Sequence, residues 1–235
     1  LMAALPNAGG PRLECWGLEL DRSPLRLALA EPRFIDLWPK HVVAALGAVA
    51  TDGYWQDSLR QHSVQMLWGD ARQQLQNLPK DLQLDLILLD AFSPGKCPQL
   101  WSEEFLQSLA SLLAPGGRLL TYCRAAAVRN SLRHAGLELR SLLPKAGEKS
   151  GWSSGTLALC SKDRDQTPPE TGPGWCGLSV MEEEHLQTRA GVPYRDPSGT
   201  DLAASILKRR QQEQALSYRP STSAWQRKWG LLRQA

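Results

Sequence analysis

The apolar run at residues 84–90 constrains the fold most, because its sequence, Leu-Asp-Leu-Ile-Leu-Leu-Asp, is short and almost uninterrupted by polar side chains. A run of this length and composition is typical of a strand buried on both faces, as in a parallel sheet covered by helices. Other short apolar runs alternate with longer amphipathic stretches from about residue 13 to residue 160. This order predicts an α/β fold with a mainly parallel sheet.

The positions of individual elements follow from the same alternation. We expect strands at residues 13–20, 63–68, 84–90, 118–123, 137–142 and 156–160, and helices at 23–30, within 39–46, and at 71–77, 102–113 and 125–135. The helix at 102–113 has the clearest start, because Ser102 suits an N-cap and acidic residues fill the first turn. The sequence Pro-Gly-Gly at 115–117 should end it and turn the chain into the next strand.

The length and composition limit the domain organisation. A chain of 235 residues, of which 42% are hydrophobic and 22% charged, forms one good core and a small appendage. We expect a first domain over residues 1–161, a Pro/Gly-rich linker over 162–180 and a helical C-terminal extension over 181–235, with helices near 181–189 and 201–216.

Composition also excludes several classes of protein. No stretch approaches the roughly twenty apolar residues of a membrane span. The five cysteines are dispersed and form no CxxC pair, which argues against a disulfide framework and against a zinc site. We therefore expect no metal, no membrane and a reducing, cytoplasmic compartment. The net charge of +3 is compatible with an RNA partner but does not require one.

Three acidic residues fall at the expected carboxyl ends of strands, namely Glu19, Asp70 and Asp90. Ligands of open parallel sheets bind beyond these ends. Glu19 suits the two ribose hydroxyls of an adenosine, and Asp70 suits the adenine amino group. Asp90 would face the reacting end of the ligand. Any one of these acids also suits a helix cap or a loop, and Asp70 could serve only as an N-cap. Three such acids at successive strand ends predict that a ligand binds at this edge of the sheet.

One part of such a site is not found in this sequence. Nucleoside sites of this kind normally begin with a strand and a glycine-rich turn. Gly9 and Gly10 precede the first expected strand, so they do not serve, and residues 1–5 have the character of a helix end. We expect the first strand and the glycine loop to lie upstream of Leu1, and this polypeptide by itself to bind cofactor poorly.

Residues 89–101, LDAFSPGKCPQLW, resemble the D-[GA]-F-[SA]-P-x-[KR]-x-P-x-[LM]-W signature of MnmC-type methyltransferases. The likeness extends through residues 114–122 and 127–136 and covers roughly residues 13–159. It implies a Rossmann-like class I methyltransferase sheet, S-adenosyl-L-methionine as cofactor, and N-methylation of 5-aminomethyl-2-thiouridine at the wobble position in the anticodon loop of tRNA. Cys97 stands where the best-known relatives carry Asn. Nothing resembles the FAD oxidase fused to some relatives, so only the methyl-transfer step is implied.

The chemistry of that step assigns roles to the residues of the signature. An alkyl amine has a pKa of about 10 and must be uncharged to react, so a carboxylate that orients it and accepts its proton is needed. Asp90 is the candidate, and the resemblance carries the same role onto it. Phe92 and Pro94 would wall the acceptor pocket and Lys96 would touch the RNA, although Phe92 equally suits a core position and Lys96 a solvated loop. For Trp101 we favour a hydrophobic anchor of the following helix.

Several basic residues are candidates for contacts with the RNA backbone. Each of them also suits a solvated helix face or loop. The candidates are Arg124, Arg129, Arg133, Lys145, Lys149, residues 208–210 and residues 225–229.

Two other functions stay open. An aminopropyltransferase of the spermidine synthase type uses the same fold, but such enzymes usually carry a further acid just after the third strand, and residues 91–94 contain none. A catalytically inactive, RNA-binding relative is favoured by the absent glycine loop and opposed by the three retained acids. If the protein were a nicotinamide dehydrogenase, residues 90–94 would have no role in its site.

Overall fold

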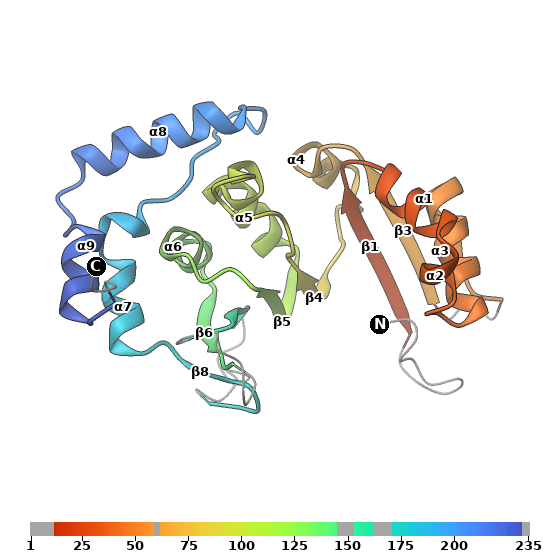
Figure 1. The fold of residues 1–235 in the computed structure, drawn as a ribbon, viewed down its shortest axis with the longest axis horizontal. Helices are drawn as coiled ribbons and strands as arrows, with labels where there is room; N and C mark the ends of the chain where they lie inside the picture. Colours follow the sequence, from red (N-terminus) through yellow and green to blue (C-terminus); the bar gives the residue numbers. More distant parts are fainter. Residues whose placement is uncertain (1–11, 59–61, 145–152, 162–170, 232–235) are drawn as a thin grey trace. The chain divides into compact units, whose positions relative to one another are not determined.

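A computed structural model describes residues 12–58, 62–144, 153–161 and 171–231 (Figure 1). The contacts divide the chain into two compact units, Leu1–Leu78 and Pro79–Ala235. The boundary that we expected near residue 161 lies inside the second unit. Each unit is described by itself.

The first unit contains a three-stranded sheet in the order β1-β3-β2. Strands β1 (Leu13–Glu19) and β3 (His62–Trp68) are parallel, as expected, and the short β2 (Tyr54–Gln56) pairs antiparallel with β3. The unit also contains helices α1 (Ser23–Ala30), α2 (Pro32–Ile35), α3 (Lys40–Asp52) and α4 (Ala71–Gln74), and the 3-10 helix η2 (Leu75–Asn77) follows α4. Helix α3 runs past the predicted end at 46 and ends at Gly53, whose φ of 73° suits a left-handed cap.

The second unit contains a five-stranded sheet in the order β4-β5-β7-β6-β8. Strands β4 (Leu84–Leu88) and β5 (Leu113–Thr121) are parallel, whereas β7 (Gly155–Leu159) is antiparallel to both β5 and β6 (Glu138–Leu142). Strand β8 (Trp175–Gly177) pairs with β6 and lies inside the segment expected to be an irregular linker. The sheet is therefore mixed rather than wholly parallel.

The Pro-Gly-Gly sequence at 115–117 behaves differently from our expectation. Helix α5 (Glu103–Ser111) ends before it, and β5 already begins at Leu113, so the three residues lie within a strand. The register of β5 on β4 shifts there, from Leu84 opposite Leu113 to Leu86 opposite Arg118. This bulge absorbs the proline and the glycines. A Cβ on Gly117 would lie 2.7 Å from the Leu84 carbonyl oxygen, so the close approach requires glycine.

Helix α6 (Ala126–His134) is the best-buried helix of the second unit. It contacts α5 on one side, β6 of the sheet, and α7 (Val180–Leu186) of the C-terminal extension. All its residues from Ala126 to Leu132 are buried. The extension continues through α8 (Ala203–Leu216) and α9 (Thr222–Lys228), and α9 contacts α7. Through α7, the C-terminal helices therefore pack against α6 of this unit rather than stand apart.

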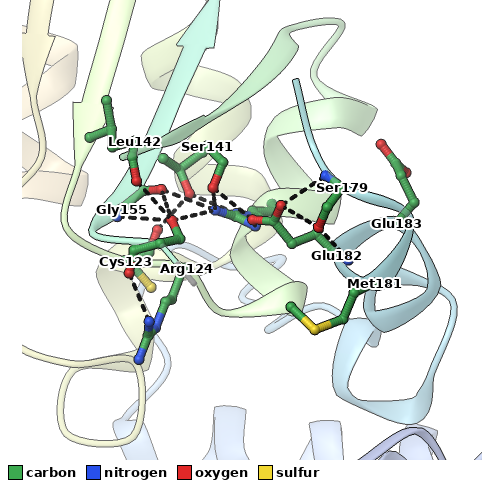
Figure 2. A network of polar contacts seen from close by, with 12 residues as sticks. Cys123, Arg124, Ser141, Leu142, Gly155, Ser179, Met181, Glu182 and Glu183 are labelled. Carbon is green, nitrogen blue, oxygen red and sulfur yellow. Dashed lines mark hydrogen bonds and ion pairs between the residues drawn. The ribbon is translucent and has the colours of Figure 1, made fainter. Parts of the chain in front are cut away.

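A buried ion pair joins α6 to α7 (Figure 2). The Arg129 guanidinium donates from Nη1 to Glu182 Oε1 at 2.7 Å, from Nε to Thr156 Oγ1 at 2.8 Å and from Nη2 to the Gly155 carbonyl at 3.0 Å. Glu182 also accepts from the Ser141 hydroxyl at 2.7 Å. Arg129 is therefore part of the interior, and the interpretation of Arg129 as an RNA contact is wrong.

In the described parts of the chain, no helix has both the length and the apolar character that crossing a membrane requires. No group of three or more His, Cys, Asp or Glu side chains there is placed to hold a metal ion.

Candidate active site

Asp90 lies directly beyond the carboxyl end of β4, in the second unit. The amide of Leu89 still donates to the Leu120 carbonyl at 2.9 Å, so the β4–β5 pairing extends to the residue before Asp90. The Asp90 side chain is exposed, and none of the described residues donates a hydrogen bond to it. The carboxylate is therefore held at the sheet edge with its lone pairs open to a ligand.

The loop after Asp90 presents an aromatic ring to solvent. The Phe92 side chain is 77% exposed, so the interpretation of Phe92 as a core residue is wrong. Lys96 is exposed and Pro94 is half-buried. A tight turn follows, because the amides of Lys96 and Cys97 both donate to the Ser93 carbonyl, at 2.8 and 2.9 Å. The three predicted acceptor-side residues thus occupy one short loop beside Asp90.

Trp101 has the structural role that we favoured. Its side chain is 0% exposed, and it closes the 3-10 turn η3 (Pro98–Trp101) that leads into α5. Its indole Nε1 donates to the Phe92 carbonyl at 2.7 Å. The following helix begins as predicted, because Ser102 Oγ accepts from the Phe105 amide at 3.3 Å while Glu103 and Glu104 occupy the first turn.

Tyr122 is a residue of this edge to which we assigned no role from sequence. It follows the parallel neighbour β5, and its phenol donates to the Ala91 carbonyl at 2.7 Å. Burial raises the pKa of Tyr122, and the nearby Cys123 and Asp90 raise it further, so the phenol stays a hydrogen-bond donor at neutral pH. The available signal was its place at the end of an expected strand next to the one that carries Asp90.

The other two acids lie together at one edge of the first unit. Glu19 pairs in register with Trp68, and the Gly69 amide donates to the Glu19 carbonyl at 2.9 Å. Glu19 Oε1 accepts from the amides of Leu20 and Asp21, at 2.7 and 3.2 Å. No described residue donates to Oε2. One oxygen of Glu19 is therefore fixed by the backbone, and the other is open to a ligand.

The Asp70 carboxylate forms more interactions within the protein than the Glu19 carboxylate does. It caps α4 by accepting from the Arg72 amide at 3.0 Å, and it forms an ion pair with the Arg72 guanidinium at 2.6 Å. The side-chain hydrogen bond from Arg72 lowers the pKa of Asp70, so the carboxylate is ionised. The structure thus shows the capping role of Asp70 and places it at the strand end next to that of Glu19.

Most of the basic candidates for RNA binding have partners within the protein. Arg133 pairs with Glu183 at 2.7 Å, and Lys228 pairs with Glu184 at 2.6 Å. Arg209 pairs with Asp201, and Arg210 donates to the carbonyls of Val192 and Ala190. Lys208 and Arg227 are exposed, and Arg124 is exposed while donating to the Ser153 carbonyl at 2.7 Å.

The remaining candidates for RNA binding are the tryptophans of the tail at 225–229 and two lysines. Trp225 is buried, stacks on His185 with centroids 4.0 Å apart and donates to the Met181 carbonyl, and Trp229 donates to Glu184 at 3.0 Å. The tail at 225–229 therefore anchors α9 on α7. Lys145 and Lys149 lie outside the described residues.

The chain is similar to known proteins along most of its length. It is 30% identical over 193 residues to the tRNA 5-methylaminomethyl-2-thiouridine biosynthesis bifunctional protein MnmC of Pseudomonas fluorescens, a match that covers 78% of this chain and 28% of the relative. The protein of the same name from Chromohalobacter salexigens is 32% identical over 207 residues, with 80% and 26% covered. The chain thus spans about a quarter of the length of these relatives.

A solved structure and a family model agree with these matches. The crystal structure of MnmC2 from Aquifex aeolicus has a TM-score of 0.63 and 20% identity, and the match covers 88% of this chain and 70% of that one. The expected class I methyltransferase fold and the MnmC-type resemblance are thereby confirmed. A family model described as S-adenosyl-L-methionine-dependent methyltransferase matches residues 37–158, which is just over half of the chain. The chain therefore belongs to the S-adenosyl-L-methionine-dependent methyltransferase family.

Proposed function

We propose that this chain methylates the exocyclic amine of 5-aminomethyl-2-thiouridine at the wobble position of tRNA. The observation that carries the proposal is the exposed carboxylate of Asp90, placed at the end of β4 in a loop with the MnmC signature. The names of the relatives supply the substrate, and they refer to proteins about three times as long. A tRNA-modifying role would also place the chain in the cytoplasm.

The residues of the first unit fit the adenosine part of the cofactor. Glu19 offers Oε2 at a strand end, where a carboxylate suits the two ribose hydroxyls, and its other oxygen is already fixed by backbone amides. Asp70 lies at the neighbouring strand end, and a carboxylate has enough lone pairs to accept an adenine amino group besides its bonds to Arg72. When bound, S-adenosylmethionine supplies an electrophilic methyl group on a sulfonium.

Asp90 would prepare the methyl acceptor. An alkylammonium has no lone pair, and at neutral pH most of an amine with a pKa of about 10 is protonated. The Asp90 side chain attracts the aminomethyl group, aligns its nitrogen and receives a proton from it. Its solvent exposure lets that proton leave to water.

Phe92 would meet the base that carries the amine. Proteins read single-stranded RNA by stacking splayed-out bases on aromatic rings, and each such stack is worth about 1–3 kcal/mol. The Phe92 ring is 77% exposed. Pro94 would complete the wall of the acceptor pocket, and Lys96 would neutralise a phosphate of the anticodon loop. The relatives favour neither an aminopropyltransferase nor an inactive RNA-binding protein.

Methyl transfer to defined tRNA tests the proposal directly. The full-length protein is incubated with methyl-labelled S-adenosylmethionine and tRNA that carries 5-aminomethyl-2-thiouridine, and the nucleosides are then separated. We expect label in the wobble nucleoside and none in a matched tRNA that carries 2-thiouridine without the aminomethyl group. Equal labelling of both tRNAs, or no label although cofactor binds, would contradict the proposed acceptor.

The Glu19→Ala variant should bind S-adenosylmethionine less tightly. Hydrogen bonds to a charged group contribute about 1.5–3 kcal/mol, so we expect Kd to rise roughly 10- to 100-fold. Isothermal titration calorimetry measures this change. Glu14→Ala is the matched control, because Glu14 is an exposed acid at the amino end of the same strand. An unchanged Kd for Glu19→Ala would remove this residue from the cofactor site.

A further inference from the structure

Two side chains from different elements hold consecutive carbonyl groups of the loop after β4. The Tyr122 phenol donates to the Ala91 carbonyl and the Trp101 indole donates to the Phe92 carbonyl, both at 2.7 Å. The two donors also touch each other, because their rings meet edge to face with centroids 6.1 Å apart and an interplanar angle of 87°. We call Tyr122 and Trp101 the carbonyl clamp.

Both donors are carried by well-fixed parts of the second unit. Trp101 is 0% exposed and closes η3, which contacts α5 and α8. Tyr122 directly follows β5, whose pairing with β4 runs through Leu88 opposite Leu120 and continues with the Leu89 amide. The clamp therefore connects the loop by hydrogen bonds both to the end of β5 in the sheet and to η3, which contacts the helices.

The loop has little else to hold it. Asp90 and Phe92 are both exposed, so neither is fixed by burial of its side chain. Among the described residues, no further hydrogen bond reaches the backbone of Ala91 or Phe92. Loop backbone that is exposed and poorly bonded opens easily. Without the clamp, the directions of the Asp90 carboxylate and the Phe92 ring would be averaged over many loop conformations.

We propose that Tyr122 is a positioning residue for methyl transfer, whose hydroxyl holds the Ala91 carbonyl so that Asp90 and Phe92 keep the orientation the methyl acceptor needs, with Trp101 as the second support. The inference rests on the proposed function and adds residues to its site. Displacement of a reacting group by about 1 Å can cost 100-fold in rate, and sites held by locked side chains are the more precise ones.

The first test is the Tyr122→Phe variant of the full-length protein, which removes one hydroxyl and keeps the ring contact with Trp101. We expect kcat for tRNA methylation to fall about 10- to 100-fold, with the Kd for S-adenosylmethionine and the KM for tRNA unchanged. Tyr218→Phe is the control, because the Tyr218 side chain is fully exposed. A wild-type kcat for Tyr122→Phe would overturn the proposal.

Two comparisons separate positioning from other roles of the same residue. If the ring of Tyr122 stacks on the RNA, Tyr122→Phe keeps wild-type activity and Tyr122→Leu raises KM, which contradicts a role of the hydroxyl. If the hydroxyl acts through Asp90, adding Tyr122→Phe to Asp90→Asn lowers the residual rate by less than about twofold, because the two residues act as a unit. If the double variant instead loses the product of the two single-variant factors in rate, Tyr122 and Asp90 act independently, which would contradict the proposal.

Amide hydrogen exchange tests the clamp without any activity. In Tyr122→Phe and in Trp101→Phe, we expect the amides of Lys96 and Cys97, which donate to the Ser93 carbonyl of the same loop, to exchange at least tenfold faster than in the wild type, while those of β5 and α5 stay protected. Unchanged exchange in Tyr122→Phe would overturn the clamp even if the protein methylates tRNA. Faster exchange in a protein that methylates no tRNA would refute the proposed function and leave the clamp in place.

Discussion

Asp90→Ala should reduce methyl transfer to tRNA by about 100- to 10,000-fold, the range of a lost general base. The reason is that the aminomethyl group then arrives mostly protonated and meets no carboxylate to orient it or take its proton. The Kd for S-adenosylmethionine should stay within about twofold of the wild type, since the ribose and adenine are assigned to other acids. Labelled-methyl incorporation and calorimetry give the two values.

The variant is informative because it should not disturb the fold. Asp90 is exposed and is not hydrogen-bonded to any described residue, so its removal leaves neither a cavity nor an unpaired group. Asp85→Ala is the matched control, because Asp85 is an exposed acid within the same strand, β4. Undiminished methylation by Asp90→Ala would rule out its role as the base, and an equal loss in Asp85→Ala would point to damage to the strand.

The Asp90→Asn variant separates orientation from proton acceptance. Asparagine keeps the size and one acceptor oxygen but carries no charge, so it can align the amine without taking its proton. Its rate should therefore depend on how much amine arrives neutral, and should rise about tenfold per pH unit below the amine pKa of about 10. A pH profile parallel to that of the wild type would show that Asp90 does not act as a base.

The order of strands and helices could be read from sequence because it depends on local patterns. The apolar run at 84–90 became β4, and Ser102 with its two following glutamates began α5. The end of that helix was misjudged, because the Pro-Gly-Gly sequence looks like a turn but lies in a bulged strand. Strands β2 and β8 were missed because each has three residues and exists only through its pairing partner.

The candidate site was predictable only in part, for the same reason. The positions of Glu19, Asp70 and Asp90 at strand ends were predictable because strand ends can be located from the apolar runs that precede them. Tyr122 was not, because its hydrogen bond to Ala91 spans 31 residues and depends on the pairing of β4 with β5. Nothing in the sequence distinguishes a tyrosine that holds a backbone carbonyl from one that merely packs.

Charged residues were the least predictable from sequence. Arg129 was a candidate contact to the RNA backbone, but its partner Glu182 lies 53 residues later in the chain. The neighbouring Asn130 donates to the carbonyls of Leu186 and Gly191, at 2.8 and 2.9 Å. A Cβ on Gly191 would lie 2.5 Å from the Asn130 amide nitrogen, so this contact also depends on glycine. Arg129 and Asn130 of α6 thus bind the C-terminal extension.

The Arg129–Glu182 pair should be sensitive to the loss of either partner. Arg129 is 2% exposed and Glu182 is 4% exposed. Burial alone would raise the pKa of Glu182, but hydrogen bonds from Ser141, Ser179 and Arg129 together lower it. Burial lowers the pKa of Arg129, and a guanidinium nevertheless stays protonated in proteins. Both groups are therefore charged and rely on each other in the interior.

Glu182→Gln should lower the free energy of unfolding by about 3–5 kcal/mol, the usual cost of leaving one partner of a buried pair unpaired. The variant keeps the size of the side chain, so the loss reports on the charge of Arg129 rather than on a cavity. Urea denaturation followed by circular dichroism measures the change as a lower midpoint at constant slope. Because this pair joins α6 to α7, the amides of α7 should lose protection from exchange first.

The neighbouring residue Glu183 provides the matched control. Glu183 pairs with Arg133 across the same two helices, but the side chains are 44% and 38% exposed, so Glu183→Gln should cost less than about 1 kcal/mol.

The pKa of Glu182 also predicts how the effect depends on pH. Because this pKa is lowered, the contribution of Glu182 to the free energy of unfolding is present above the unfolded-state pKa of about 4.3 and is lost as pH falls through the lower folded-state pKa. The difference between wild type and Glu182→Gln should therefore shrink in acid. A difference that is constant with pH, or no larger than that of Glu183→Gln, would show that the ion pair does not hold the C-terminal extension.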